Sequence, residues 1–86
     1  MIEIYYKDDK DSERSLTFGD KAVGLKFNPS GDQDVNEIKA LYAKIIDGLN
    51  ALRGTDRSER ARLLSVAITE AQTAQMWAVK AITWKD

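Results

Sequence analysis

The feature that most constrains this fold is the short connection, residues 53–56, between two long helical patterns. Gly54 suits the left-handed conformation that ends many helices, and the Thr55-Asp56 pair can cap the next one. Because so short a connection has no room for a linker or a further element, the two helices must fold back as an antiparallel hairpin. We therefore predict a first helix over 32–53 and a second over 57–83.

The first helical pattern carries a heptad-like apolar stripe, with spacings that alternate between three and four residues. Its members are Val35, Ile38, Tyr42, Ile45, Leu49 and Leu52. Gly48 interrupts the pattern at a cost of roughly 1 kcal/mol relative to alanine. Either another element approaches the helix closely at Gly48, or the helix tolerates the loss.

The second helical pattern is apolar on more than one side. A seam of mostly small residues consists of Leu64, Ala67, Ala71, Ala74, Ala78 and Ala81. Much of the remaining circumference carries Leu63, Ile68, Trp77, Val79 and Ile82. One hairpin partner cannot bury all of this surface, and a chain of 86 residues forms only a marginal core by itself. We therefore expect the second helix to be central in a homo-oligomer.

The segment before the hairpin, residues 1–27, carries the alternation and the residue types of strands. Residues 2–6 (Ile-Glu-Ile-Tyr-Tyr) alternate, and residues 15–18 (Ser-Leu-Thr-Phe) alternate again, so the two could pair as a β-ribbon. Residues 22–27 are expected to be strand-like or extended. The predicted fold class is α+β, in a single domain over residues 1–86 with a short N-terminal β-ribbon before the helical hairpin.

The composition excludes several classes of function. The chain has no cysteine and no histidine, so zinc sites, nucleophile–histidine pairs and histidine acid–base chemistry are excluded. No Gly-rich phosphate motif or supported pair of catalytic carboxylates is present. We expect no enzymatic activity, no catalytic residues, no metal and no cofactor.

The charge and hydropathy also limit the partners and the compartment. A net charge of −1 argues against non-specific binding to DNA or RNA. No apolar run approaches the roughly 18 residues of a membrane span, so no membrane partner is expected. The absence of disulfides is typical of a reducing cytoplasm.

The turn at residues 27–32 (Phe-Asn-Pro-Ser-Gly-Asp) precedes the first helix. Pro29 biases Asn28 away from helical geometry, so the chain must arrive extended and then turn. Free N–H groups at a helix start attract anions, and an aromatic and an amide beside them could hold a phosphorylated ligand. The alternative is an ordinary helix entry with Phe27 in the core.

One face of the second helix is polar and nearly uncharged. It consists of Arg62, Ser65, Thr69, Gln72 and Met76, at spacings of three and four residues. Such a row could lie in a subunit interface, where hydroxyls and amides satisfy one another. It could also line a pocket in which Arg62 meets a phosphate and Thr69 or Gln72 reads a base edge.

Two further groups have structural and functional interpretations. Three acids near the start of the first helix, Asp32, Asp34 and Glu37, could bind a hard cation, although capping and the helix dipole explain them. Four aromatic residues could stack on bases, although core or interface packing also accounts for them. These are Tyr5, Tyr6, Trp77 and Trp84.

Two segments resemble a family of small phage proteins. Residues 16–32 (LTFGDKAVGLKFNPSGD) and residues 67–81 (AITEAQTAQMWAVKA) are similar to the phage anti-defence nucleotide sponges that share a helical-hairpin domain. These are the Thoeris anti-defence and anti-CBASS sponges, and the resemblance covers roughly residues 16–84.

The resemblance implies that the protein binds a cyclic nucleotide signal in the cytoplasm of the infected bacterium. The signal would be a cyclic ADP-ribose isomer or a cyclic di- or trinucleotide, held without cleavage and so kept from the host effector. The resemblance also implies a homo-oligomer, often a hexamer, with sites between subunits.

The ligand-binding residues that the resemblance implies are Phe27, Asn28, Ser30, Gly31, Asn36, Arg53, Arg62 and Thr69. Phe27 would stack on a base, and Asn28 and Ser30 would bond ribose or phosphate. Gly31 would offer a backbone N–H. Arg62 and Thr69 would complete the pocket from the same or a neighbouring chain.

Two other functions remain open on the residues alone. The chain could be an oligomeric protein-interaction or regulatory module without a small ligand, bound through its apolar helix. It could also bind single-stranded nucleic acid through its aromatics, although the balanced charge argues against this.

Overall fold

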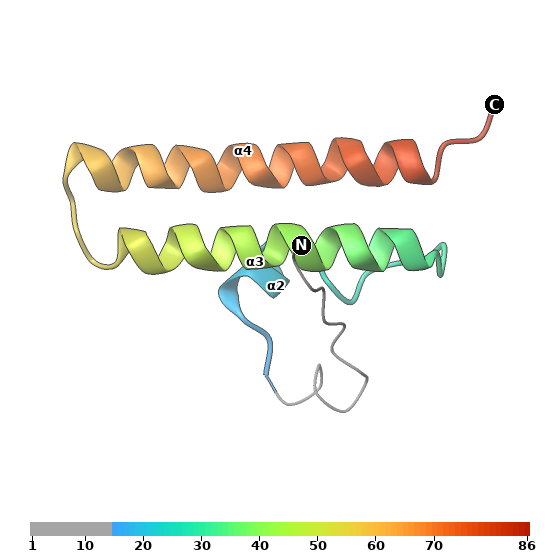
Figure 1. Ribbon diagram of the computed structural model, residues 1–86, viewed down its shortest axis with the longest axis horizontal. Helices are drawn as coiled ribbons and strands as arrows, with labels where there is room; N and C mark the ends of the chain where they lie inside the picture. Colours follow the sequence, from blue (N-terminus) through green and yellow to red (C-terminus); the bar gives the residue numbers. More distant parts are fainter. Residues whose placement is uncertain (1–14) are drawn as a thin grey trace, which may run out of the picture.

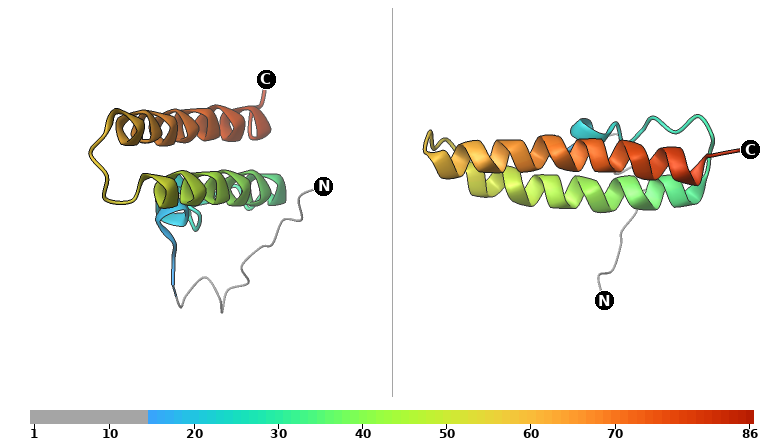
Figure 2. Two further views of the ribbon diagram at one scale, coloured as in Figure 1. Left: turned by 60° about the vertical axis from the view of Figure 1, so that its left-hand side comes forward. Right: turned by 90° about the horizontal axis from the view of Figure 1, so that it is seen from above.

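The computed structural model describes residues 15–86, which form three helices (Figure 1). They are α2 (Phe18–Val23), α3 (Gln33–Arg53) and α4 (Glu59–Ile82). The helices α3 and α4 run antiparallel and lie side by side along their length in all views (Figure 2). The predicted helical hairpin is therefore present, with bounds that differ from 32–53 and 57–83 by one or two residues.

The predicted α+β class is wrong, because the described residues are helical and contain no strand. Residues 15–18 do not form a strand; instead Thr17 caps α2. The Thr17 hydroxyl oxygen accepts a hydrogen bond from the Asp20 backbone N–H, and the Asp20 carboxylate accepts one from the Thr17 N–H, both at 3.0 Å. This reciprocal capping box starts a helix where the short alternation had suggested a strand. The strand predicted at 2–6 lies outside the described residues.

The segment 22–27, predicted to be extended, is also different in the structure. Ala22 and Val23 end α2, and Gly24 takes the left-handed conformation with φ 62°. A turn follows, in which the Phe27 N–H donates to the Gly24 carbonyl at 2.9 Å. Helix α2 is thus a short element that returns the chain toward the start of α3.

Side-chain caps fix the two long helices. Asp32 caps α3 by accepting a hydrogen bond from the Asp34 N–H at 2.7 Å, and Gly54 ends it. Ser58, rather than Thr55 or Asp56, caps α4 by accepting from the Ala61 N–H at 3.3 Å. The Asp56 carboxylate accepts from the backbone and hydroxyl of Ser58, which lowers the pKa of Asp56.

The core lies where the three helices meet. Its buried members are Val23, Ala43, Ile46 and Ile68, with Ala22, Leu25, Tyr42, Leu49 and Ala71 packed against them. Helix α2 packs mainly on α3, and it is tied to α4 by a hydrogen bond from the Gln72 amide to the Ala22 carbonyl at 3.1 Å. The core thus fixes α2 and the turn that follows it on the hairpin.

Much apolar surface is left outside this core. The exposed large side chains of α4 and the residues after it are Leu63, Val66, Met76, Trp77 and Trp84. Two members of the stripe predicted on the first helix, Ile45 and Leu52, are also exposed. None of the described helices is long and apolar enough to cross a membrane.

Candidate functional site

The turn at residues 27–32 is held by its own side chains. The Asn28 amide nitrogen donates to the Asp32 carbonyl and to the Asn36 side-chain oxygen, both at 2.8 Å. The Ser30 hydroxyl donates to the Asn28 side-chain oxygen at 2.6 Å and accepts from the Asp32 N–H at 3.1 Å. Gly31 has φ 68°, and its N–H donates to the Asn28 carbonyl at 3.1 Å. These bonds make the turn preorganised.

Phe27 is the first residue of this turn and is not in the core: it is 71% exposed. The interpretation of Phe27 as a core residue at a helix entry is therefore wrong. Lys39 of α3 lies beneath it, with Nζ 5.5 Å from the centre of the Phe27 ring. The same ammonium donates to the Phe27 carbonyl and, at 3.0 Å, to the Gly24 carbonyl. An exposed aromatic ring thus stands beside a preorganised polar turn.

Arg53, at the opposite end of α3, joins a second group of candidate residues. Its guanidinium donates to the Ser65 hydroxyl at 3.0 Å and to the Asn50 side-chain oxygen at 2.6 Å. The guanidinium carbon lies 5.5 Å from the centre of the Phe18 ring. Two helices and the start of α2 therefore meet at Arg53, which is partly buried.

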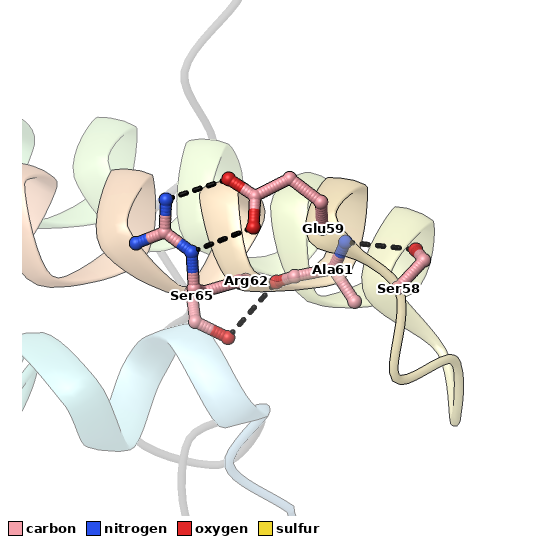
Figure 3. Close-up of polar contacts among 5 residues, drawn as sticks. All are labelled: Ser58, Glu59, Ala61, Arg62 and Ser65. Carbon is pink, nitrogen blue, oxygen red and sulfur yellow. Dashed lines mark hydrogen bonds and ion pairs between the residues drawn. The ribbon is translucent and has the colours of Figure 1, made fainter.

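Arg62 forms an exposed ion pair with Glu59, one turn earlier on α4 (Figure 3). The guanidinium donates to both carboxylate oxygens, at 2.9 and 2.6 Å. This contact lowers the pKa of Glu59 and raises the pKa of Arg62. A phosphate could take the place of Glu59, because it offers the same fork of acceptor oxygens.

The polar face predicted on the second helix divides between inward and outward positions. Ser65 and Gln72 are partly buried and bond to the rest of the chain. Thr69 and Met76 are exposed, and the Thr69 hydroxyl donates to the Ser65 carbonyl at 3.2 Å. The outward positions remain open to a subunit interface or to a ligand.

Residues 20–83 match the family described as "Acb2/Tad1, hairpin domain". The chain belongs to this family. It is the family of phage anti-defence nucleotide sponges directed at CBASS and Thoeris immunity, which confirms the resemblance stated above. No curated protein and no solved structure matches the chain.

The segment shared with the Acb2/Tad1 hairpin domain contains both groups of candidate residues, but one chain does not bring the groups together. Asn36 lies in the first turn of α3 and Arg53 is its last residue. At a rise of 1.5 Å per residue the two are about 25 Å apart along the helix. The turn group is Phe27, Asn28, Ser30, Gly31 and Asn36, and the group beyond it is Arg53, Arg62 and Thr69.

A shallow hollow of about 280 Å³ lies on the exposed face of α4, bordered by Thr73, Met76, Trp77 and Lys80. The Lys80 ammonium lies 5.4 Å from the Trp77 ring centre and 5.8 Å from that of Trp84. This hollow belongs to the exposed apolar face of α4 rather than to either group. Among the described residues, no cluster of acids could hold a metal ion.

Sequence reasoning missed two residues that the structure brings to these groups. Lys39 was not singled out, although it stands four residues after Val35 and four before Ala43, on the buried side of α3. A lysine that falls at helical spacing between two apolar residues, Val35 and Ala43, was the signal that could have identified it. Phe18 was assigned to a strand, which hid its contact with Arg53.

Proposed function

We propose that this protein is a phage anti-defence sponge that binds and sequesters a cyclic nucleotide immune signal without cleaving it. The signal is a cyclic ADP-ribose isomer or a cyclic di- or trinucleotide. Sequestration in the cytoplasm of the infected bacterium keeps the signal from the host effector. The observation that carries the proposal is that the match to the family includes the turn at 27–32, with its exposed aromatic ring.

The turn group suits the sugar-phosphate and base parts of such a ligand. Phe27 offers an exposed face on which a base can stack, an interaction worth about 1–3 kcal/mol. Asn28 and Ser30 hold the turn together through the hydrogen bond from the Ser30 hydroxyl to the Asn28 side-chain oxygen, and that oxygen keeps a second lone pair for a ribose hydroxyl. Because Asn36 accepts from Asn28, its amide nitrogen remains as a donor for a phosphate or ribose oxygen. The Gly31 N–H is already donated to the Asn28 carbonyl at 3.1 Å, so Gly31 shapes the turn through its positive φ instead of offering a free donor.

The second half of the pocket comes from another copy of the chain. Arg53, Arg62 and Thr69 supply two guanidinium groups and a hydroxyl, which suit phosphates, but Arg53 lies about 25 Å from Asn36 along α3 within one chain. The exposed apolar residues of α4 are the surface through which copies assemble. We expect a homo-oligomer, by analogy with the family a hexamer, with each site between two subunits.

A sponge must bind more tightly than the receptor it competes with. Nanomolar affinity, about −12 kcal/mol, meets this need. Charge-assisted hydrogen bonds to phosphates, together with stacked bases, can supply this affinity. Because the turn is preorganised, little conformational entropy is lost when the ligand binds.

Calorimetric titration with cyclic ADP-ribose isomers, cyclic dinucleotides and cyclic trinucleotides tests the proposal. Tight, saturable binding of one class is expected. After denaturation, mass spectrometry should recover the ligand intact. Recovery of only a cleaved product would show that the protein is an enzyme. If none of the tested nucleotides bound, the proposed sponge function would be contradicted.

Two substitutions at one position serve as matched variants. Phe27→Trp keeps a stacking face, whereas Phe27→Leu keeps apolar bulk without one. Binding should persist in the first and fall at least tenfold in the second. Equal losses in both would mean that Phe27 does not stack on the ligand.

The exposed apolar face of α4 favours a second candidate, a protein-interaction module without a small ligand. Arg62→Ala separates the two functions. A sponge loses nucleotide affinity while its mass by light scattering is unchanged, whereas an interaction module changes its assembly and binds no nucleotide in either form.

A further inference from the structure

Lys39 is a charged residue on the buried side of α3. Its side chain is 5% exposed, and burial lowers its pKa. A buried ammonium is costly unless polar groups replace the water it loses. Here the replacements are two backbone carbonyls, those of Gly24 and Phe27, to which Nζ donates. A methionine would fill the same space without that cost, so the charge itself calls for an explanation.

Both carbonyls belong to a turn over residues 24–27, which ends at Phe27 and leads into the turn at 27–32. Gly24 starts this turn with φ 62°, and its carbonyl also accepts from the Phe27 N–H at 2.9 Å. The ammonium therefore ties both ends of the turn to α3, from a position 12 and 15 residues further along the chain.

The same ammonium also faces the Phe27 ring, with Nζ 5.5 Å from the ring centre. A cation within about 6 Å of an aromatic face is attracted to it. A phenylalanine that is 71% exposed has few apolar neighbours to hold its ring. Lys39 thus fixes the backbone of Phe27 and attracts its ring.

We propose that Lys39 is a positioning residue, which holds the Phe27 ring in the orientation that stacks on a nucleotide base. The inference rests on the proposed function, because it takes Phe27 as the stacking residue. Lys39 acts through Phe27 and through the turn, from beneath the ring, while the opposite face of the ring receives the ligand.

A double-mutant cycle separates positioning from a general role in folding. Dissociation constants are measured by calorimetry for the full chain, Lys39→Met, Phe27→Leu and the double variant. The probes are cyclic ADP-ribose isomers, cyclic dinucleotides and cyclic trinucleotides, each titrated separately. Lys39→Met should weaken binding about tenfold when Phe27 is present and less than twofold in the Phe27→Leu background. The same loss in both backgrounds would overturn the proposal.

Lys21→Met is the matched control, since it removes the same charge from an exposed side chain of α2. It should change the affinity less than twofold. A loss as large as that of Lys39→Met would assign the effect to net charge and overturn the proposal.

A ligand-free measurement keeps the inference testable if Lys39→Met does not fold. In NMR spectra of the unchanged protein, the Lys39 ε-methylene protons should be shifted upfield by the Phe27 ring and show cross-relaxation to it. Lysine shifts without a ring-current effect would overturn the proposal. If none of the nucleotides binds but the NMR spectra show the contact between Lys39 and the Phe27 ring, the proposed function fails. The positioning of the Phe27 ring by Lys39 is then still supported.

Discussion

Gly19 of α2 lies directly against the backbone of Ala43 in α3. A Cβ on Gly19 would be 2.0 Å from the Ala43 carbonyl oxygen and 2.8 Å from its carbonyl carbon. The Gly19 N–H also donates to the Asp47 carboxylate at 2.6 Å. Since Gly19 has no positive φ, space rather than backbone conformation requires glycine here. This contact fixes α2 on the hairpin and, through it, the turn that carries Phe27.

Replacing Gly19 with alanine should therefore destabilise the protein. The added methyl group must displace α2 from α3, which also lengthens the Gly19–Asp47 hydrogen bond. A loss of about 1–3 kcal/mol in the free energy of unfolding is expected, as for other overpacked sites. Urea unfolding followed by circular dichroism measures it. Stability within about 0.5 kcal/mol of the unchanged protein would contradict the close contact.

Gly48 of α3, unlike Gly19, has free space around it. A Cβ there meets nothing within 4 Å. Gly48→Ala should raise the free energy of unfolding by up to about 1 kcal/mol, because alanine loses less backbone entropy in a helix. The same urea experiment, with light scattering as a check on assembly, tests this. A loss of stability or of assembled mass would show that another copy packs closely on Gly48.

The ion pair between Glu59 and Arg62 predicts a pH effect. Arg62 lowers the pKa of Glu59 in the folded state. The stabilisation from this pair is therefore fully present above the unfolded pKa of Glu59, and it is lost as the pH falls through the lower folded pKa. In an NMR titration of the side-chain carboxyl carbons, Arg62→Gln should raise the pKa of Glu59 toward its usual value.

Arg60→Gln is the control for this titration, because it removes the same charge next to Glu59 without removing the ion pair. The pKa of Glu59 should stay low in that variant. A pKa that rises equally in both variants would mean that general charge, rather than the contact with Arg62, lowers it.

The hairpin could be predicted from the sequence because its determinants are local. Apolar side chains repeat with helical spacing, and Gly54 marks where the first helix ends. Helix α2 was missed because a four-residue alternation was given more weight than the Thr17–Asp20 capping pair. In so short a segment, two reciprocal hydrogen bonds and a close contact with α3 decide the conformation.

The candidate site could be predicted only in part. The turn at 27–32 was identified from its residue types, but its internal bonds and the exposure of Phe27 depend on the folded chain. The partners of Lys39 are backbone carbonyls, which carry no residue-type signal. The separation of Arg53 from the turn group follows from helix length. How another copy brings them together depends on contacts between chains, which helical periodicity does not specify.

Asn36 allows a test of which hydrogen-bonding group the turn presents to a ligand. Its side-chain oxygen accepts from the Asn28 amide at 2.8 Å. The Asn36 amide nitrogen, which can only donate, is the group left for a phosphate or ribose oxygen. Asn36→Asp keeps an acceptor for Asn28 and replaces the outer donor with an anionic oxygen.

The expected result of Asn36→Asp is a loss of nucleotide affinity of at least tenfold, because a donor is lost and a negative charge faces the ligand. The free energy of unfolding should change by less than about 0.5 kcal/mol, since the bond from Asn28 is retained. Calorimetric titration and urea unfolding measure the two effects. Asn36→Ala is the comparison, because it removes both groups and should lower affinity and stability together. Unchanged affinity in Asn36→Asp would show that this amide does not face the ligand, since a carboxylate cannot replace its donor.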